Sequence, residues 1–146
     1  MLKLTAVMVW CVGLALMWNI GYAYAEFCID IDHLNRFYLQ ITAETTTSRG
    51  SVLSLVGLRE SVHLSPVTGT LFVEPETVPT QARVTLANVG NNDVILTYTM
   101  HLGEVSDPLG TAFTGLYSVW QPSSPVPVGN GAASLVDCQT GALIHF

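Results

Sequence analysis

The chain has 146 residues with few charges, mostly acidic: five lysines and arginines against eleven aspartates and glutamates, a formal net charge of −6. This length allows one domain. Affinity for nucleic acid comes largely from lysine and arginine contacts to phosphate, so the acidic balance argues against a nucleic-acid partner. It argues against binding an anionic lipid surface for the same reason.

The first 25 residues have the pattern of a secretory signal peptide. Lys3 gives a positive start, the stretch over 4–16 is almost purely apolar, and Ala23-Tyr24-Ala25 forms an A-x-A cleavage site. An uncleaved membrane anchor is the alternative, because the apolar stretch is long enough to cross a bilayer; however, Asn19 interrupts it. We therefore predict a signal-peptide helix over 1–25 and a single mature domain over 26–146. The mature domain would be secreted or periplasmic, with no membrane association after cleavage.

Two cysteines remain once the predicted leader and its Cys11 are removed, namely Cys28 and Cys138. An even number of cysteines in an exported protein predicts a disulfide. The α-carbons of the pair must come within about 7 Å of each other, so this bond would place the first and last strands side by side. Two separate buried thiols are the alternative.

Alternating apolar and polar residues, interrupted by turn residues, predict strands along the first half of the mature chain. The apolar residues over 28–37 come closest to the spacing of a helix, but the pattern is too weak to predict one. The predicted strands cover 36–42, 51–58, 60–64 and 68–73. A polar tract over 45–50 is expected to end the first of them, and a loop bracketed by Pro75 and Pro79 to follow the last.

The second half begins with the clearest predicted hairpin, made of strands 81–89 and 94–102. Gly90-Asn91-Asn92-Asp93 is its turn, because glycine and asparagine tolerate positive φ. The strand predicted next covers 111–120, after a turn over 107–110, and the proline-rich segment 122–131 is predicted as a loop. Closing strands are predicted over 133–138 and 142–146.

This succession predicts an all-β fold: a closed or nearly closed antiparallel up-and-down β-barrel of about eight strands, with a two-sheet β-sandwich as the alternative. The strand rhythm across 28–146 resembles the calycin barrels of lipocalin or avidin type. The resemblance is one of fold only. A Gly-x-Trp near the first strand is missing, and Trp120 is the only tryptophan outside the predicted leader. The resemblance therefore implies a fold and carries over no ligand-binding residue.

Signatures of catalysis and metal binding are weak in this sequence. There is no G-x-S-x-G motif and no closely spaced histidine pair. Asp30 and Asp32, beside His33, would share one face of a strand and offer oxygen ligands to a hard cation. We favour the alternative that these residues lie at a solvated strand edge and bind no cation. We predict no catalytic residue, no metal site and no cofactor.

The candidate ligand-binding residues are Tyr98, Met100, Tyr117 and Trp120, which a barrel could gather around an apolar cavity at its mouth. The favoured alternative is that aromatic side chains fill the core, since an eight-stranded barrel is just wide enough to hold them. The leading functional hypothesis is an exported, non-enzymatic domain that binds a small apolar or amphipathic ligand. The alternatives are a structural or interaction protein with a partner in the cell envelope or at the surface, and a hydrolase with a polar cleft.

Overall fold

The structure is a computed structural model that describes residues 25–32, 35–74, 80–89 and 94–144. These residues form β1 (Phe27–Ile31), β2 (Asn35–Thr47), β3 (Gly50–Glu60), β4 (Leu64–Glu74), β5 (Gln81–Val89), β6 (Ile95–Asp107), β7 (Gly110–Trp120) and β8 (Gly129–Val136). The predicted signal-peptide helix lies outside the described residues except for Ala25. So do the predicted turn over 90–93 and the loop over 75–79.

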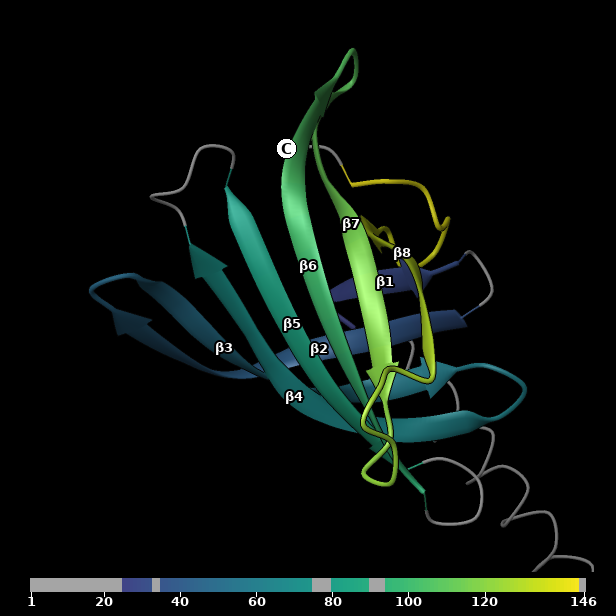
Figure 1. Cartoon of the computed structure of the whole chain (residues 1–146). Helices are drawn as coiled ribbons and strands as arrows, with labels where there is room; N and C mark the ends of the chain where they lie inside the picture. Colours follow the sequence, from purple (N-terminus) through teal and green to yellow (C-terminus); the bar gives the residue numbers. More distant parts are fainter. Residues whose placement is uncertain (1–24, 33–34, 75–79, 90–93, 145–146) are drawn as a thin grey trace, which may run out of the picture.

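The strands close into an antiparallel barrel in which each strand pairs with the next along the chain (Figure 1). β1 also pairs with β8, with Cys28 opposite Val136 and Ile31 opposite Ala133. Beyond the barrel wall, the β2–β3 and β6–β7 hairpins extend in different directions (Figure 1). The predicted up-and-down barrel is thereby confirmed, and the two-sheet sandwich is not the fold.

Strand limits differ from the sequence-based prediction mainly at the hairpin ends. β5 has the limits that the sequence predicts, and its pairing with β6 confirms the predicted hairpin. The polar tract over 45–50 was expected to end a strand, but β2 continues to Thr47, which pairs with Gly50 of β3. Backbone pairing across the hairpin continues there although these side chains are exposed.

Two predicted strands near turns are wrong or reduced. The segment over 60–64 was predicted to be a strand, but 61–63 form the turn between β3 and β4, where Ser61 Oγ donates to the carbonyl of His63 at 3.2 Å. The predicted closing strand over 142–146 is represented, within the described residues, by one bridge between Val136 and Leu143. β8 instead begins at Gly129, inside the segment predicted as a loop.

The barrel interior is apolar because alternate residues of each strand point inward. β5 shows the alternation most clearly: every second residue from Ala82 to Asn88 is buried, and the residues between them are exposed. Phe37 and Tyr98 meet edge to face with ring centroids 5.0 Å apart. The largest fully buried side chains come from six different strands: Ile29, Phe37, Leu39, Leu55, Val67, Val84, Leu86, Tyr98 and Met100.

Inward-facing glycines allow neighbouring strands to approach closely. A Cβ on Gly57 would lie 1.9 Å from the carbonyl oxygen of Tyr38, and a Cβ on Gly115 would lie 1.8 Å from that of His101. No side chain fits at such distances, and glycine inside a strand often marks a sharp bend of a barrel wall. These positions therefore require glycine for the barrel to close as it does.

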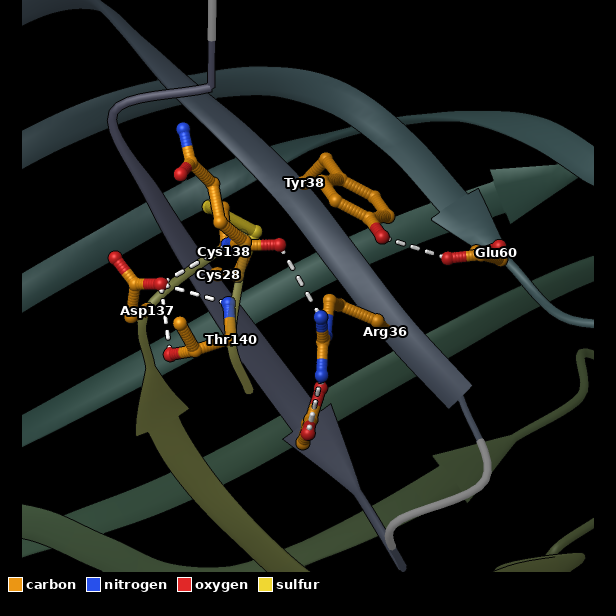
Figure 2. The surroundings of a disulfide bond; sticks show 9 residues. Cys28, Arg36, Tyr38, Glu60, Asp137, Cys138 and Thr140 are labelled. Carbon is orange, nitrogen blue, oxygen red and sulfur yellow. Dashed lines mark hydrogen bonds and ion pairs between the residues drawn. A yellow bond between two sulfur atoms is a disulfide. The ribbon is translucent and has the colours of Figure 1, made fainter. Parts of the chain in front are cut away.

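The predicted disulfide between Cys28 and Cys138 is present, with α-carbons 5.1 Å apart (Figure 2). It lies on the outside of the barrel, where Cys28 is packed with Tyr38 and Val136 in a second, small apolar cluster. Arg36 reinforces the join from the next strand, because its Nη1 donates to the carbonyl of Cys138 at 3.2 Å. The bond thus ties the start of β1 to the segment that follows β8.

Candidate ligand-binding cavity

One end of the barrel interior is hollow. A cavity of about 600 Å³ lies where β1 begins and β8 ends. The described residues that line it come from all eight strands and from the segments flanking β1 and β8, and all but one are apolar: Glu26, Phe27, Ile29, Ile41, Leu53, Leu71, Val73, Ala82, Val84, Leu102, Phe113, Leu135 and Ile144. Such a volume and lining are typical of sites for small apolar molecules.

The hollow arises from where large and small side chains fall along the strands. Toward the closed end, Phe37 and Tyr98 fill the interior. Toward the open end, the inward positions of β5 carry the smaller side chains of Val84 and Ala82. A bulge in β2 after Ile41 shifts the register of the wall at this end. The large side chains therefore fill the interior at one end of the barrel, and a hollow remains toward the other end.

Polar side chains at the closed end form hydrogen bonds with one another, although the buried Nε of Arg59 has no partner among the described residues. Arg59 lies over the ring of Tyr98, 5.2 Å from its centroid, and donates to Asn35 Oδ1 at 3.2 Å and Asn88 Oδ1 at 3.5 Å. The side-chain amide of Asn88 in turn donates to Ser65 Oγ at 2.7 Å. Burial raises the pKa of Tyr98. This network is a floor beneath the cavity rather than part of its lining.

A second polar pair lies at the same closed end. Tyr117 donates its hydroxyl to Asp32, whose other carboxylate oxygen accepts the backbone N–H of Ala132 at 3.0 Å. Asp32 has a positive φ of 52°, and its carboxylate occupies the space above Gly131, where a Cβ would lie 2.1 Å from Oδ1. Burial, together with the hydrogen bond to Asp32, raises the pKa of Tyr117 to about 12. The tyrosine is therefore a hydrogen-bond donor at neutral pH.

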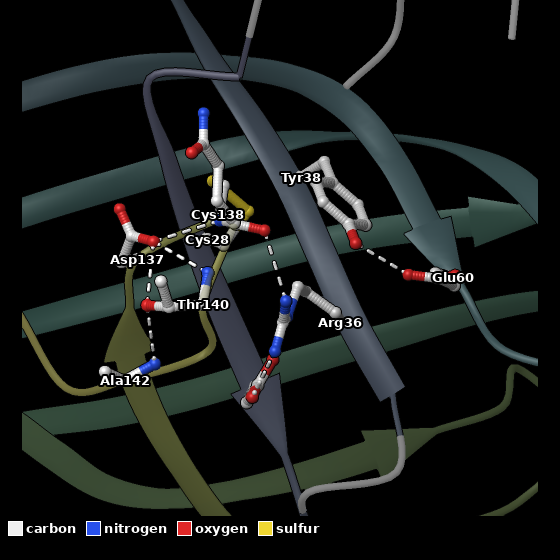
Figure 3. Close-up of polar contacts among 10 residues, drawn as sticks. Cys28, Arg36, Tyr38, Glu60, Asp137, Cys138, Thr140 and Ala142 are labelled. Carbon is white, nitrogen blue, oxygen red and sulfur yellow. Dashed lines mark hydrogen bonds and ion pairs between the residues drawn. A yellow bond between two sulfur atoms is a disulfide. The ribbon is translucent and has the colours of Figure 1, made fainter. Parts of the chain in front are cut away.

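The C-terminal segment folds back over the open end. Asp137 Oδ1 accepts hydrogen bonds from the backbone N–H and hydroxyl of Thr140 at 2.8 and 2.9 Å, forming a tight turn (Figure 3). The backbone hydrogen bond from Thr140 is the main reason that the pKa of Asp137 is lowered. After this turn, Ile144 donates its backbone N–H to the carbonyl of Leu135 at 3.3 Å and adds its side chain to the cavity lining. The disulfide at Cys138 holds the turn in place.

The four predicted ligand-binding residues occupy other places than the cavity wall. Tyr98 and Met100 are buried inside the barrel, and Tyr117 is paired with Asp32. Trp120 lies on the outer face, 37% exposed, with its Nε1 donating to Thr99 Oγ1 at 3.1 Å. None of the four is among the lining residues, and a ligand contact by any of them remains a prediction.

Three of the four predicted residues, Tyr98, Met100 and Tyr117, lie on the inward faces of β6 and β7, at a different depth from the cavity lining. Leu102 and Phe113, which line the cavity, share the inward faces of β6 and β7 with Tyr98 and Tyr117. Alternation distinguishes inside from outside, whereas the depth of a residue in the barrel depends on the stagger between strands. The sequence signal that could have located the cavity was the presence of small inward-facing residues such as Ala82, with the side chains next to them.

The two aspartates considered for a cation site do not converge. Asp30 forms an ion pair with Arg36, with Nε 2.6 Å from Oδ1, while Asp32 is turned toward Tyr117; His33 lies outside the described residues. Over 25–32, 35–74, 80–89 and 94–144, no three histidine, cysteine, aspartate or glutamate side chains gather in a way that would hold a metal ion.

Comparisons with known proteins give no match. No protein-family model matches the chain, and no curated protein or solved structure is similar enough to be counted as a match. Across the described ranges we find no helical segment with the length and apolar character that a membrane span requires.

Proposed function

We propose that this protein binds a small apolar or amphipathic molecule in the cavity of its barrel, without catalysing a reaction. The proposal depends on one observation, a hollow of about 600 Å³ whose lining, in the part of the chain that the structure describes, is apolar except for Glu26. Binding pockets for small molecules typically have about 300–1,000 Å³. An apolar cavity of about 150 Å³ accommodates benzene, so this one has room for a ligand roughly four times as large.

The proposed place of action is the periplasm or the exterior of the cell. The disulfide between Cys28 and Cys138 is compatible with such a location, because disulfides persist in oxidising compartments and are rare in the cytosol. The predicted leader over 1–25 supports the same location.

The arrangement of the interior favours ligand binding over the two alternatives. A structural component of an envelope assembly would be expected to have a filled interior, whereas here a hollow of about 600 Å³ lies at one end of the barrel. A hydrolase needs polar groups directed at a substrate. The polar side chains at the closed end instead bond to one another, Arg59 to Asn88 and Tyr117 to Asp32.

A pair of neighbouring substitutions tests the proposal. Leu71 and Thr70 are adjacent in β4, but Leu71 lines the cavity, whereas Thr70 is exposed and pairs with Ser54 and Thr85 on the outer face. Leu71→Trp would place an indole in the cavity, and Thr70→Trp would place the same group outside. Binding of an uncharged environment-sensitive dye such as Nile red is measured by fluorescence titration of the wild type and both variants.

We expect the dye to bind the wild type and Thr70→Trp with similar affinity, and to bind Leu71→Trp about tenfold or more weakly because the cavity is occupied. Circular dichroism and thermal melting establish that both variants are folded. Equal affinity for all three proteins would place the dye elsewhere, and absence of binding to the folded wild type would contradict the proposal.

A further inference from the structure

The charge at the mouth of the cavity indicates which amphipathic molecules it accepts. Glu26 is the one polar residue among the described residues of the lining, and it is exposed at the point where the chain enters β1. Two hydrogen bonds hold it against β2: its backbone N–H donates to the carbonyl of Leu39 at 2.9 Å, and its Oε2 accepts the N–H of Ile41 at 3.1 Å. A carboxylate is therefore fixed where the apolar wall meets solvent.

Two more carboxylates belong to the inward face at this end. Glu44 is paired with Leu53, and Glu104 is paired with Phe113. Directly paired residues of antiparallel strands have their side chains on the same face, and both Leu53 and Phe113 line the cavity. Glu104 is held near the rim because its Oε2 accepts the backbone N–H of Thr80 at 3.1 Å.

Positive charge is placed elsewhere in the described part of the chain, where no arginine or histidine lines the cavity. Arg59 lies in the closed end, and Arg83 is directed outward, 3.5 Å from Glu74. Arg36 is outside the barrel, paired with Asp30. Arg49 is in the turn of the β2–β3 hairpin, four residues from Leu53 and hence roughly 13 Å along the strand.

Cleavage after Ala25, which the sequence predicts, would add an ammonium group at Glu26 itself. Counting the described residues alone, the rim would then carry one positive charge and three negative charges, from Glu26, Glu44 and Glu104, and would remain negative. The net charge of the whole chain has the same sign, since its eleven acidic residues outnumber its five basic ones.

From this distribution we propose that the cavity takes amphipathic molecules with a positively charged head, such as an amine or a quaternary ammonium, and disfavours those with a carboxylate or sulfate head. The apolar body lies in the hollow and the head group lies at the rim beside Glu26. This inference rests on the proposed binding function. A negative head would meet a net negative charge at the rim, whereas the binding of an uncharged head would depend little on this charge.

Three probes with the same tail separate the effect of the head group from that of the apolar body: decyltrimethylammonium, decanol and decanoate. Each displaces the uncharged dye in a competition titration with the full chain at low ionic strength, below the concentration at which the probes form micelles. Glu26→Gln removes the charge at the rim while keeping an oxygen to accept the N–H of Ile41. Glu74→Gln removes the same charge from the outward-facing ion pair with Arg83 and serves as the matched control.

We expect the cation to bind most tightly and decanoate most weakly in the wild type. Glu26→Gln should weaken binding of the cation by about threefold to tenfold, as expected for an ion pair at a solvated rim, and leave decanol unchanged. Glu74→Gln should leave the order and the affinities as they are.

The two proposals fail in different ways. If decanol and the dye bind but the cation has no advantage over decanoate, or if Glu26→Gln and Glu74→Gln act alike, the head-group inference is overturned while the cavity remains a binding site. If neither the dye nor any probe binds the folded wild type, the proposed function itself is overturned.

Discussion

Removing the disulfide should lower the stability of the barrel without dismantling it. The perturbation is the double substitution Cys28→Ala/Cys138→Ala. In the folded protein, β1 is paired with β8 through its own backbone hydrogen bonds from Cys28 to Ile31, and Cys138 lies beyond the end of β8. The strands that close the barrel therefore remain paired when the sulfurs are removed, and the main effect falls on the unfolded chain.

The magnitude follows from the length of chain that the bond closes. Cys28 and Cys138 are separated by 110 residues. In the chain-entropy model a loop of this length is restricted in the unfolded state by an amount equivalent to about 5 kcal/mol at room temperature. Single domains have total stabilities of about 5–15 kcal/mol. The substitution should therefore remove a third or more of the stability of a typical domain.

Urea unfolding followed by circular dichroism measures this loss. We compare the wild type, the wild type with a reducing agent, and the double alanine variant with and without the same agent. The reduced wild type keeps both sulfur atoms, so it separates the effect of the bond from the effect of the small cavity left by alanine. Both forms without the bond should unfold at a lower urea concentration, with native-like spectra before the transition and a somewhat larger m-value.

Two results would refute this reasoning. A loss below about 1 kcal/mol would mean that the unfolded chain is not restricted by the bond as the chain-entropy model requires. A double variant without native-like β structure in the absence of urea would mean that the strand pairing of β1 and β8 cannot close the barrel by itself.

Two other predictions concern the barrel wall and the closed end. Gly57→Ala should destabilise the fold by about 3 kcal/mol or more because its Cβ would meet the carbonyl of Tyr38. Gly103→Ala, with open space at its Cβ, should change stability by less than about 0.5 kcal/mol. Thermal melting of both variants measures the two effects, and equal effects would contradict the prediction. The pKa of Tyr117 is raised to about 12, so the folded state retains the proton that the unfolded state releases near pH 10. The stability from this group is complete below about pH 10 and is lost as the pH rises through about 12, a loss of about 2 kcal/mol. Tyr117→Phe should show a smaller decrease in unfolding free energy between pH 10 and 12 in urea titrations, and an unchanged decrease would remove Tyr117 as its source.

The period of two along the strands and the turn residues between them predicted an all-β barrel correctly, because both are local properties. β5 illustrates this: its alternation extends without interruption from Gln81 to Val89, and the structure has these same limits. The pairing of Cys28 with Cys138 was also predictable, since these are the only two cysteines of the predicted mature domain over 26–146. Strand ends were less predictable. Thr47 is polar but still pairs with Gly50, because a hairpin can continue beyond the part of the barrel that buries side chains.

The sequence by itself determined which side chains point into the barrel, and the tertiary structure alone decided which of them face empty space. Tyr98 and Leu102 lie on the same inward face of β6, yet Tyr98 packs against Phe37 while Leu102 lines the cavity. Their depth is decided by the stagger of all eight strands and by the bends that glycines such as Gly57 permit. The lining of the cavity also depends on Ile144, which returns to the rim after the disulfide between Cys28 and Cys138, two residues 110 positions apart. None of these is a property of neighbouring residues, and so none could be read from the order of residues along one strand.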